Sequence, residues 1–68
     1  MKFKTGDLAK IKEGALVLEY APKHKDRIIL ITQKVRNDRL YGRNEELYDF
    51  LGNETNFGVW DYELEKIK

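Results

Sequence analysis

Apolar and polar residues alternate along much of this 68-residue chain, and the alternation predicts short β-strands rather than long helices. In residues 8–12, the apolar side chains of Ala9 and Ile11 alternate with lysines, as in a half-buried strand. The same period of two runs through residues 15–21. Pro22 follows and should end the pairing, because proline has no backbone N–H to donate. The first third of the chain therefore predicts two strands.

The longest apolar run lies in residues 27–35 and predicts the strongest strand of the chain. Residues 28–31 are all apolar and mostly β-branched, which favours an extended backbone over a helix. A run that is apolar on both faces indicates a central strand that is covered on both sides. The polar segment 36–39 then predicts a turn, and residues 40–42 predict a short returning strand.

Residues 44–51 allow two interpretations. A short helix would begin after Asn44, a good N-cap residue, and would end at Gly52. Three apolar side chains would then share one helical face: Leu47, Phe50 and Leu51. The alternative is an extended loop, because one or two helical turns are stable only when they dock on another element. We favour the helix, docked on the strands.

The last part of the chain predicts a strand at 57–61, a single 3₁₀ turn at 62–64 and a final strand at 65–68. Five short strands with little helix indicate one all-β domain spanning residues 1–68, a small five-stranded barrel. Closing the sheet into a barrel would remove exposed edge strands. The expected core consists of Leu8, Ile11, Val17, Leu18, Ile29, Ile31, Val59, Leu64 and Ile67, with Trp60 partly covering it.

Three segments of the chain carry a family resemblance: KTGDLAKI at 4–11, GALVLEY at 14–20 and WDYELEKI at 60–67. They resemble small, uncharacterised SH3-like barrel proteins encoded by tailed bacteriophages, and the opening is similar to that of KOW-type ribosomal and transcription-factor domains. The resemblance implies an SH3-like barrel and a role on host machinery or in the virion. It supplies no catalytic residues. Residues 36–57 have no counterpart in it and resemble an insertion before the last aromatic strand.

Composition excludes several other classes of protein. The chain has no cysteine, so disulfides and cysteine-ligated zinc are excluded. Its longest apolar stretch is far shorter than the ~20 residues needed to cross a bilayer. Lysines near the start are not followed by an apolar core, so we expect no signal peptide. We expect a cytoplasmic protein, in the host cell cytoplasm if it is phage-encoded, or a component of the virion.

Positive charge is concentrated in the first two thirds of the chain. The net charge is only +1, but residues 1–43 hold eleven Lys or Arg against five Asp or Glu, whereas residues 44–68 hold two against seven. Guanidinium groups bind phosphates and aromatic rings stack on unpaired bases. The candidate nucleic-acid contacts are Lys23, Lys25, Arg27, Arg36, Arg39, Arg43 and Tyr41. Alternatively, the acidic residues fold against these cations and neutralise them as surface ion pairs.

Aromatic residues suggest a different kind of site. Tyrosine and tryptophan are enriched at the energetic centres of protein interfaces, and an aromatic groove on an SH3-like barrel also suits a polyproline ligand. The candidate interface residues are Tyr20, Tyr48, Trp60 and Tyr62. The alternative is that these rings cover a small core from outside, because large aromatic side chains dominate core burial.

The remaining polar residues do not indicate catalysis. His24 is the only histidine, lies between two lysines and is expected to be an exposed loop residue. Glu45, Glu46 and Asp49 lie close in sequence, and Glu45 and Asp49 could form a weak cation site on a helix; the acidic first turn of the expected helix explains Glu45 and Glu46 without a metal ion. We therefore predict a non-enzymatic binding module without cofactor or metal. Its expected partner is another protein, and single-stranded nucleic acid or RNA is the alternative.

Overall fold

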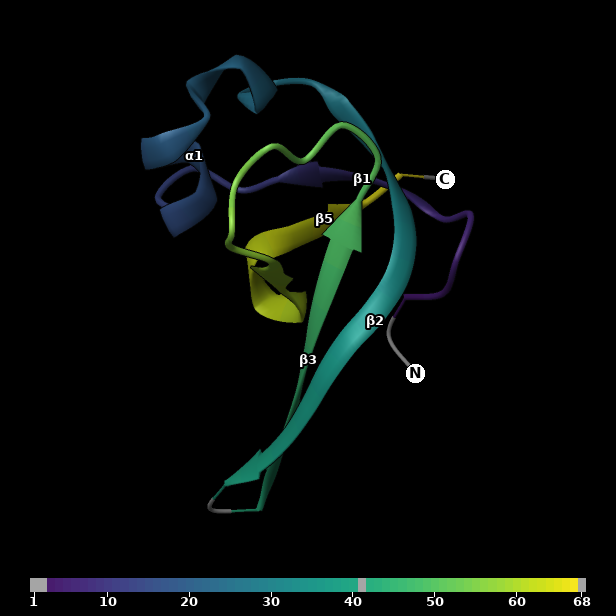
Figure 1. The fold of residues 1–68 in the computed structure, drawn as a ribbon. Coiled ribbons are helices and arrows are strands. Elements are labelled where there is room, and N and C mark those ends of the chain that lie inside the picture. The colour runs from purple at the N-terminus through teal and green to yellow at the C-terminus, as the bar shows by residue number, and fades with distance from the viewer. Residues whose placement is uncertain (1–2, 41, 68) are drawn as a thin grey trace.

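The computed structural model describes residues 3–40 and 42–67 and contains one five-stranded antiparallel sheet (Figure 1). Its strands are β1 (Leu8–Ile11), β2 (Ile28–Leu40), β3 (Arg43–Phe50), β4 (Val59–Trp60) and β5 (Leu64–Lys66). Their order in the sheet is β4-β3-β2-β1-β5, and every neighbouring pair is antiparallel. The prediction of an all-β domain with five strands is confirmed.

The long strand β2 belongs to two half-sheets and gives the fold its barrel-like curvature. Its first residues pair with β1, and its later residues pair with β3. Register shifts at Ile31/Gln33 and Lys34/Arg36 mark bulges, which bend a strand and increase its twist. The edge strands β4 and β5 do not pair with each other; the 3₁₀ turn η2 (Asp61–Glu63) joins them. The expected closure of the barrel is therefore wrong, since the sheet stays open between its edges.

The predicted strand at 15–21 is also wrong. The chain forms a short helix there, α1 (Leu16–Tyr20), and continues into the 3₁₀ turn η1 (Pro22–His24). The apolar residues are too few to distinguish a period of two from a helical period, and the helix buries Val17 together with Ala21 four residues later. Pro22 fits the start of η1, where its missing N–H costs nothing.

The predicted turn at 36–39 and the predicted helix at 44–51 are both replaced by one long hairpin. Strand β2 continues to Leu40, and the reversal occurs at Gly42, which has a positive φ of 76°. The expected returning strand at 40–42 is therefore wrong for Gly42, and Tyr41 lies outside the described residues. Along β3 the buried side chains alternate, with Glu46, Tyr48 and Phe50 facing inward. The sequence does not show this alternation plainly, because the inward position 46 holds a charged glutamate instead of an apolar residue.

The hydrophobic core lies between the two half-sheets, under α1. Six expected core residues are buried: Ile11, Val17, Ile29, Ile31, Val59 and Leu64. Leu18, Ile67 and Trp60 are only partly buried, as was expected for Trp60. Leu8 is 45% exposed, so its assignment to the core is wrong. Tyr48, Phe3 and Phe50 fill the core instead.

Candidate protein-binding groove

A groove of about 360 Å³ lies where α1, β3, β4 and η2 meet residues 56–58. Most of its lining is apolar: Leu16, Leu47, Phe57, Gly58, Trp60 and Tyr62, with Asn56 and Glu63 as polar members. We call this surface, together with the adjacent Tyr20, the aromatic groove. It brings together three of the four predicted interface residues, Tyr20, Trp60 and Tyr62. Leu16 and Leu47 complete the apolar lining, although residue type does not distinguish them from leucines of the core.

Two aromatic stacks flank the groove. Tyr20, at the end of α1, stacks on Phe57 with ring centroids 4.6 Å apart and planes inclined by 24°. Trp60 and Tyr62 lie nearly parallel, with centroids 6.2 Å apart. The backbone N–H of Trp60 donates to Glu63 Oε1 at 2.9 Å, which fixes the 3₁₀ turn that carries Tyr62. The rings are therefore held by short-range contacts that exist before any ligand arrives.

Gly58 forms part of the floor of the groove because no other residue fits there. A Cβ atom at this position would lie 2.8 Å from the backbone O of Tyr48 and 2.9 Å from Cγ of Leu47. Strand β4 therefore approaches β3 closely, in the register that pairs Leu47 with Trp60. The close approach places the Trp60 ring beside Leu47 and sets the depth of the groove.

A hydrogen-bonded loop holds Phe57 in place. Asn53 Nδ2 donates to Asp49 Oδ1 at 2.9 Å and to the backbone O of Phe57 at 2.8 Å. The backbone N–H of Thr55 donates to Asn53 Oδ1 at 3.0 Å. A second depression of about 260 Å³ adjoins the groove here and shares Leu47, Asn56, Phe57 and Gly58 with it. Its remaining lining is more polar and comprises Gln33, Val35, Asp49, Asn53 and Thr55.

The electrostatic character of the groove is acidic. Asp49, in the adjoining depression, and Glu63, in the groove, are the acidic residues among the described residues that line the two depressions, and none of these is Lys or Arg. The pKa of Tyr62 is raised above its usual value, first by partial burial and then by the nearby carboxylates of Glu63 and Glu45. The Tyr62 hydroxyl therefore stays protonated at neutral pH, with negative charge around it.

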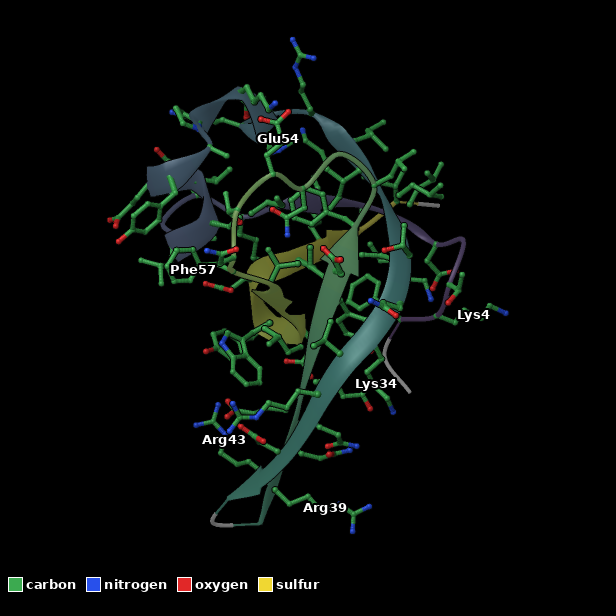
Figure 2. All side chains as sticks on the ribbon, viewed as in Figure 1. Lys4, Lys34, Arg39, Arg43, Glu54 and Phe57 are labelled. Carbon is green, nitrogen blue, oxygen red and sulfur yellow. The ribbon has the colours of Figure 1, made fainter. Side chains whose placement is uncertain are left out.

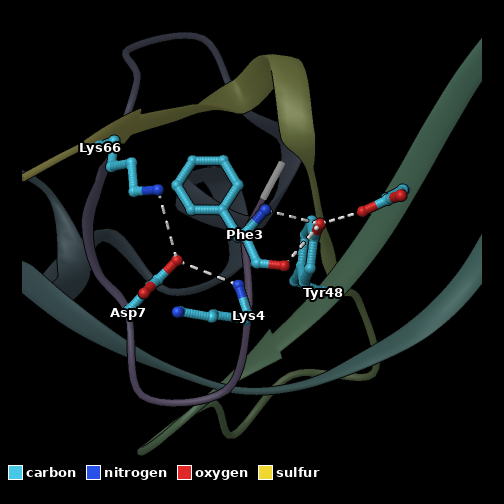
Figure 3. Close-up of polar contacts among 6 residues, drawn as sticks. Phe3, Lys4, Asp7, Tyr48 and Lys66 are labelled. Atoms are coloured by element: carbon cyan, nitrogen blue, oxygen red, sulfur yellow. Dashed lines mark hydrogen bonds and ion pairs between the residues drawn. The ribbon is translucent and has the colours of Figure 1, made fainter. Parts of the chain in front are cut away.

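Tyr48, the fourth predicted interface residue, is fully buried, so that prediction is wrong (Figure 3). The backbone N–H of Phe3 donates to the Tyr48 hydroxyl at 3.0 Å, and this hydroxyl donates to the buried carboxylate of Glu46. Burial, followed by the hydrogen bond with Glu46, raises the pKa of Tyr48 to about 12. The Tyr48 ring also packs edge-to-face on Phe3, with centroids 5.5 Å apart.

Tyr48 therefore anchors the start of the chain to the core. Figure 3 shows a second anchor beside it: the backbone N–H of Lys4 donates to Asp7 Oδ2 at 3.0 Å. The same oxygen lies 3.7 Å from Nζ of Lys66. Together these contacts join the first residues of the chain to β5 and β3.

Carboxylates neutralise most of the predicted nucleic-acid contacts. Lys23 pairs with Glu54 at 2.6 Å, and Lys25 pairs with Glu13 at 3.8 Å. On the β2–β3 hairpin, ion pairs hold two arginines: Arg36 with Asp38 at 2.8 Å and Arg43 with Glu45 at 3.4 Å. Arg27 and Arg39 are exposed, and Tyr41 lies outside the described residues.

These basic residues also do not converge on one surface. Figure 2 shows Glu54, the partner of Lys23, at one end of the molecule and Arg39 and Arg43 near the tip of the hairpin at the other. Arg39 and Arg43 point to opposite sides of the hairpin, consistent with the register that pairs Arg39 with Asn44 and Arg43 with Leu40. The structure therefore separates the two basic segments.

His24 and the three clustered carboxylates also differ from expectation. His24 is buried and packs edge-to-face on Phe50, with centroids 4.9 Å apart, so it is not an exposed loop residue. Glu45 and Asp49 lie on the other face of β3 from the buried Glu46. Within residues 3–40 and 42–67, no three His, Asp or Glu side chains are close enough to hold a metal ion together. No helix in the same part of the chain is long and apolar enough to cross a membrane.

The fold and the groove define a small all-β domain with a barrel-like sheet and a preformed aromatic groove at one side of it. No protein-family model, curated protein or solved structure gives a significant match to this chain. The function therefore has to be argued from the residues of the groove.

Proposed function

We propose that this protein is a non-enzymatic binding module that engages an extended segment of another protein in the aromatic groove. The observation that carries the proposal is the groove itself, in which Trp60, Tyr62 and Phe57 line one concave surface. Tyrosine and tryptophan contribute most to binding when they lie in such a pocket, because they bury a large area with little loss of conformational freedom.

The chemistry of the groove indicates the kind of segment it binds. Parallel and stacked rings suit apolar side chains of a peptide in the polyproline II conformation, which needs no partner strand. Glu63 lines the groove and Asp49 lines the adjoining depression, so the partner should carry lysine or arginine next to its apolar residues. The resemblance to small phage-encoded barrels suggests a host factor or a virion component as the source of this segment.

Single-stranded nucleic acid or RNA remains the alternative prediction. Its support is weaker, because four of the seven candidate residues are held in ion pairs and the two basic segments lie apart. If it holds, a labelled oligonucleotide should bind at low salt and dissociate steeply as the salt concentration rises.

The proposal can be tested with a library of random short peptides displayed on a surface. We expect wild-type protein to enrich peptides that combine proline or other apolar residues with lysine or arginine. Trp60→Ala, which removes one wall of the groove, should lose this enrichment. The matched control is Ile28→Ala, which removes an exposed apolar side chain that lines neither depression and should leave the enrichment unchanged.

An NMR titration of wild-type protein with one enriched peptide then locates the site. We expect the largest shifts at the indole of Trp60 and at the backbone of residues 57–62. Enrichment that is equal for wild type and Trp60→Ala, or shifts confined to another surface, would overturn the proposal.

A further inference from the structure

A second apolar surface lies on the outer side of the half-sheet formed by β2, β1 and β5. The inward residues of this half-sheet are buried, among them Ala9, Ile11, Ile29 and Ile31. Side chains alternate along a strand, so the residues between them point outward. These outward residues are also mostly apolar, although the core is already complete on the other side.

Four aliphatic residues form one row across this outer side. Leu8 is the register partner of Leu30. On one side of this pair, the backbone N–H of Ile67 donates to the backbone O of Leu8 at 3.1 Å. On the other side, the backbone N–H of Leu51 donates to the backbone O of Leu30 at 2.9 Å. The row is therefore Ile67, Leu8, Leu30 and Leu51.

A second row lies next to the first and contains Ile28, Lys10 and Glu65, which are register partners in that order. We call the two rows together the aliphatic face. Three of its members are strongly exposed: Leu51 at 67%, Ile28 at 58% and Leu8 at 45%. The solvent side of an antiparallel sheet is normally polar, and a contiguous apolar patch on a small protein marks an interaction site.

We propose that the aliphatic face binds the same face of a second copy of this chain, so that the protein forms a face-to-face dimer. The charges of the face support this occupant. Lys10 and Glu65 are its ionisable residues and are register partners, so the face has no net charge and two copies do not repel each other. The described residues of the aromatic groove carry negative charge only, from Glu63 and the adjoining Asp49, so two copies of the groove would not complement each other.

A two-fold axis makes this face self-complementary. If the axis runs parallel to β1 and β2 and between them, Leu8 of each protomer lies opposite Leu30 of the other. The same axis places Ile67 opposite Leu51. Such pairing suits a 68-residue chain without cysteine, because small domains that lack disulfides and metals often gain stability from oligomerisation.

Sedimentation from micromolar to millimolar concentration tests the dimer. We expect the mass to rise with concentration from the 8.1 kDa of one chain toward twice that value. Leu51→Lys places a charge in the aliphatic row without touching the core, so it should weaken association by about tenfold or more. Val35→Lys is the matched control: Val35 is similarly exposed, at 56%, but lies on the β2–β3 hairpin outside the face. This control should associate like wild type.

Charge reversal identifies the partner as a second copy. Lys10→Glu leaves two negative charges on the face, and Glu65→Lys leaves two positive charges, so each variant alone should be monomeric. An equimolar mixture of the two variants should regain the dimer, because opposite faces then meet. Circular dichroism confirms that each variant is folded. Wild-type protein that stays at 8.1 kDa up to millimolar concentration would overturn the proposal. So would a dimer that persists in Leu51→Lys, or a mixture of the reversed variants that stays monomeric.

Discussion

The two apolar surfaces of this molecule, the aromatic groove and the aliphatic face, differ in shape, in residue types and in the elements that form them. The aromatic groove is concave, has rings from α1, β4, η2 and the loop before β4, and carries negative charge from Glu63 and the neighbouring Asp49. The aliphatic face is built from outward positions of one half-sheet, contains leucine and isoleucine but no ring, and carries one charge of each sign. Exposed apolar area alone therefore does not define a binding mode, because a groove suits an extended segment and a sheet face suits another sheet.

The two surfaces also depend on different parts of the chain. The groove needs α1, β3, β4, residues 56–58 and η2, whereas the face needs β1, β5, the start of β2 and Leu51. A change confined to one surface should therefore leave the other intact. The following predictions test that separation, beginning with the largest expected effect.

Gly58→Val should disrupt the groove and strongly destabilise the fold. The added side chain would meet the backbone O of Tyr48, which cannot move without separating β4 from β3. We expect the free energy of unfolding to fall by about 3 kcal/mol or more, measured by urea denaturation. Gly42→Asn is the control, because its positive φ lies at an open hairpin tip and asparagine tolerates such a backbone. Equal denaturation midpoints for the two variants would contradict the close packing under the groove.

Tyr48 should make stability depend on alkaline pH. Its pKa is about 12 in the folded protein, against about 10 for an unfolded tyrosine, so the folded state retains the proton longer. The stabilisation is fully present below pH 10 and is lost as pH rises from about 10 to 12, by roughly 2–3 kcal/mol. Tyr48→Phe should lack this loss, when unfolding is measured across the same pH range. Identical slopes for the two proteins would show that Tyr48 is not held as described.

Tyr48→Phe should also lower stability at neutral pH. It removes the hydroxyl that donates to the buried Glu46 carboxylate and accepts from the Phe3 N–H. We expect a cost of about 1–3 kcal/mol, because buried polar groups that lose their partner keep their desolvation penalty. Tyr48 lies in the core beneath β4, so self-association of the folded variant should be unchanged.

Trp60→Ala should impair the aromatic groove and leave the aliphatic face intact. Its ring is only partly buried, so the variant should fold while binding of an enriched peptide weakens by about tenfold or more. The sedimentation behaviour should remain that of wild type, since Trp60 is not part of the aliphatic face. Leu51→Lys should give the reverse result, with peptide binding retained and association lost. A folded variant that loses both peptide binding and self-association would show that the two surfaces are not independent.

Tyr20→Ser should have the smallest effect. It removes the ring that stacks on Phe57 at 4.6 Å, a contact at the rim of the groove. We expect peptide affinity to fall by the equivalent of about 0.5–1.5 kcal/mol, as measured by calorimetry. A double-mutant cycle with Phe57→Leu should show that the two changes are not additive. Strict additivity would indicate that the stack does not shape the groove.

Much of the sheet could be predicted from the sequence, because alternation identifies strands whose buried positions are apolar. This holds for β1, for the start of β2 and for the closing order of strand, 3₁₀ turn and strand. It failed on β3, where the inward position of Glu46 is polar and its carboxylate accepts a hydrogen bond from the Tyr48 hydroxyl. It also failed at α1, because five residues of an apolar segment fit either period.

The two surfaces were predictable to different degrees. Residue type pointed to Tyr20, Trp60 and Tyr62, but the positions of Leu16, Leu47 and Gly58 beside them follow from the topology of the sheet. Tyr48 has the same residue type and lies in the core, because its position on β3 points inward. The aliphatic face contains Ile28 and Leu30, from the apolar run at 28–31 that predicts a strand covered on both sides. Within one protomer only Ile29 and Ile31 are buried, and the proposed dimer would supply the second cover.

The pairing of β1 with β5 also sets the order in which the two surfaces arise during synthesis. The β2–β3 hairpin joins neighbouring residues through a tight turn, so it can form early, whereas residues 9 and 66 pair across nearly the whole chain. The row of the aliphatic face lacks Ile67 until that residue has left the ribosome. The aliphatic row is therefore completed after the aromatic groove, whose last residue along the chain is Glu63.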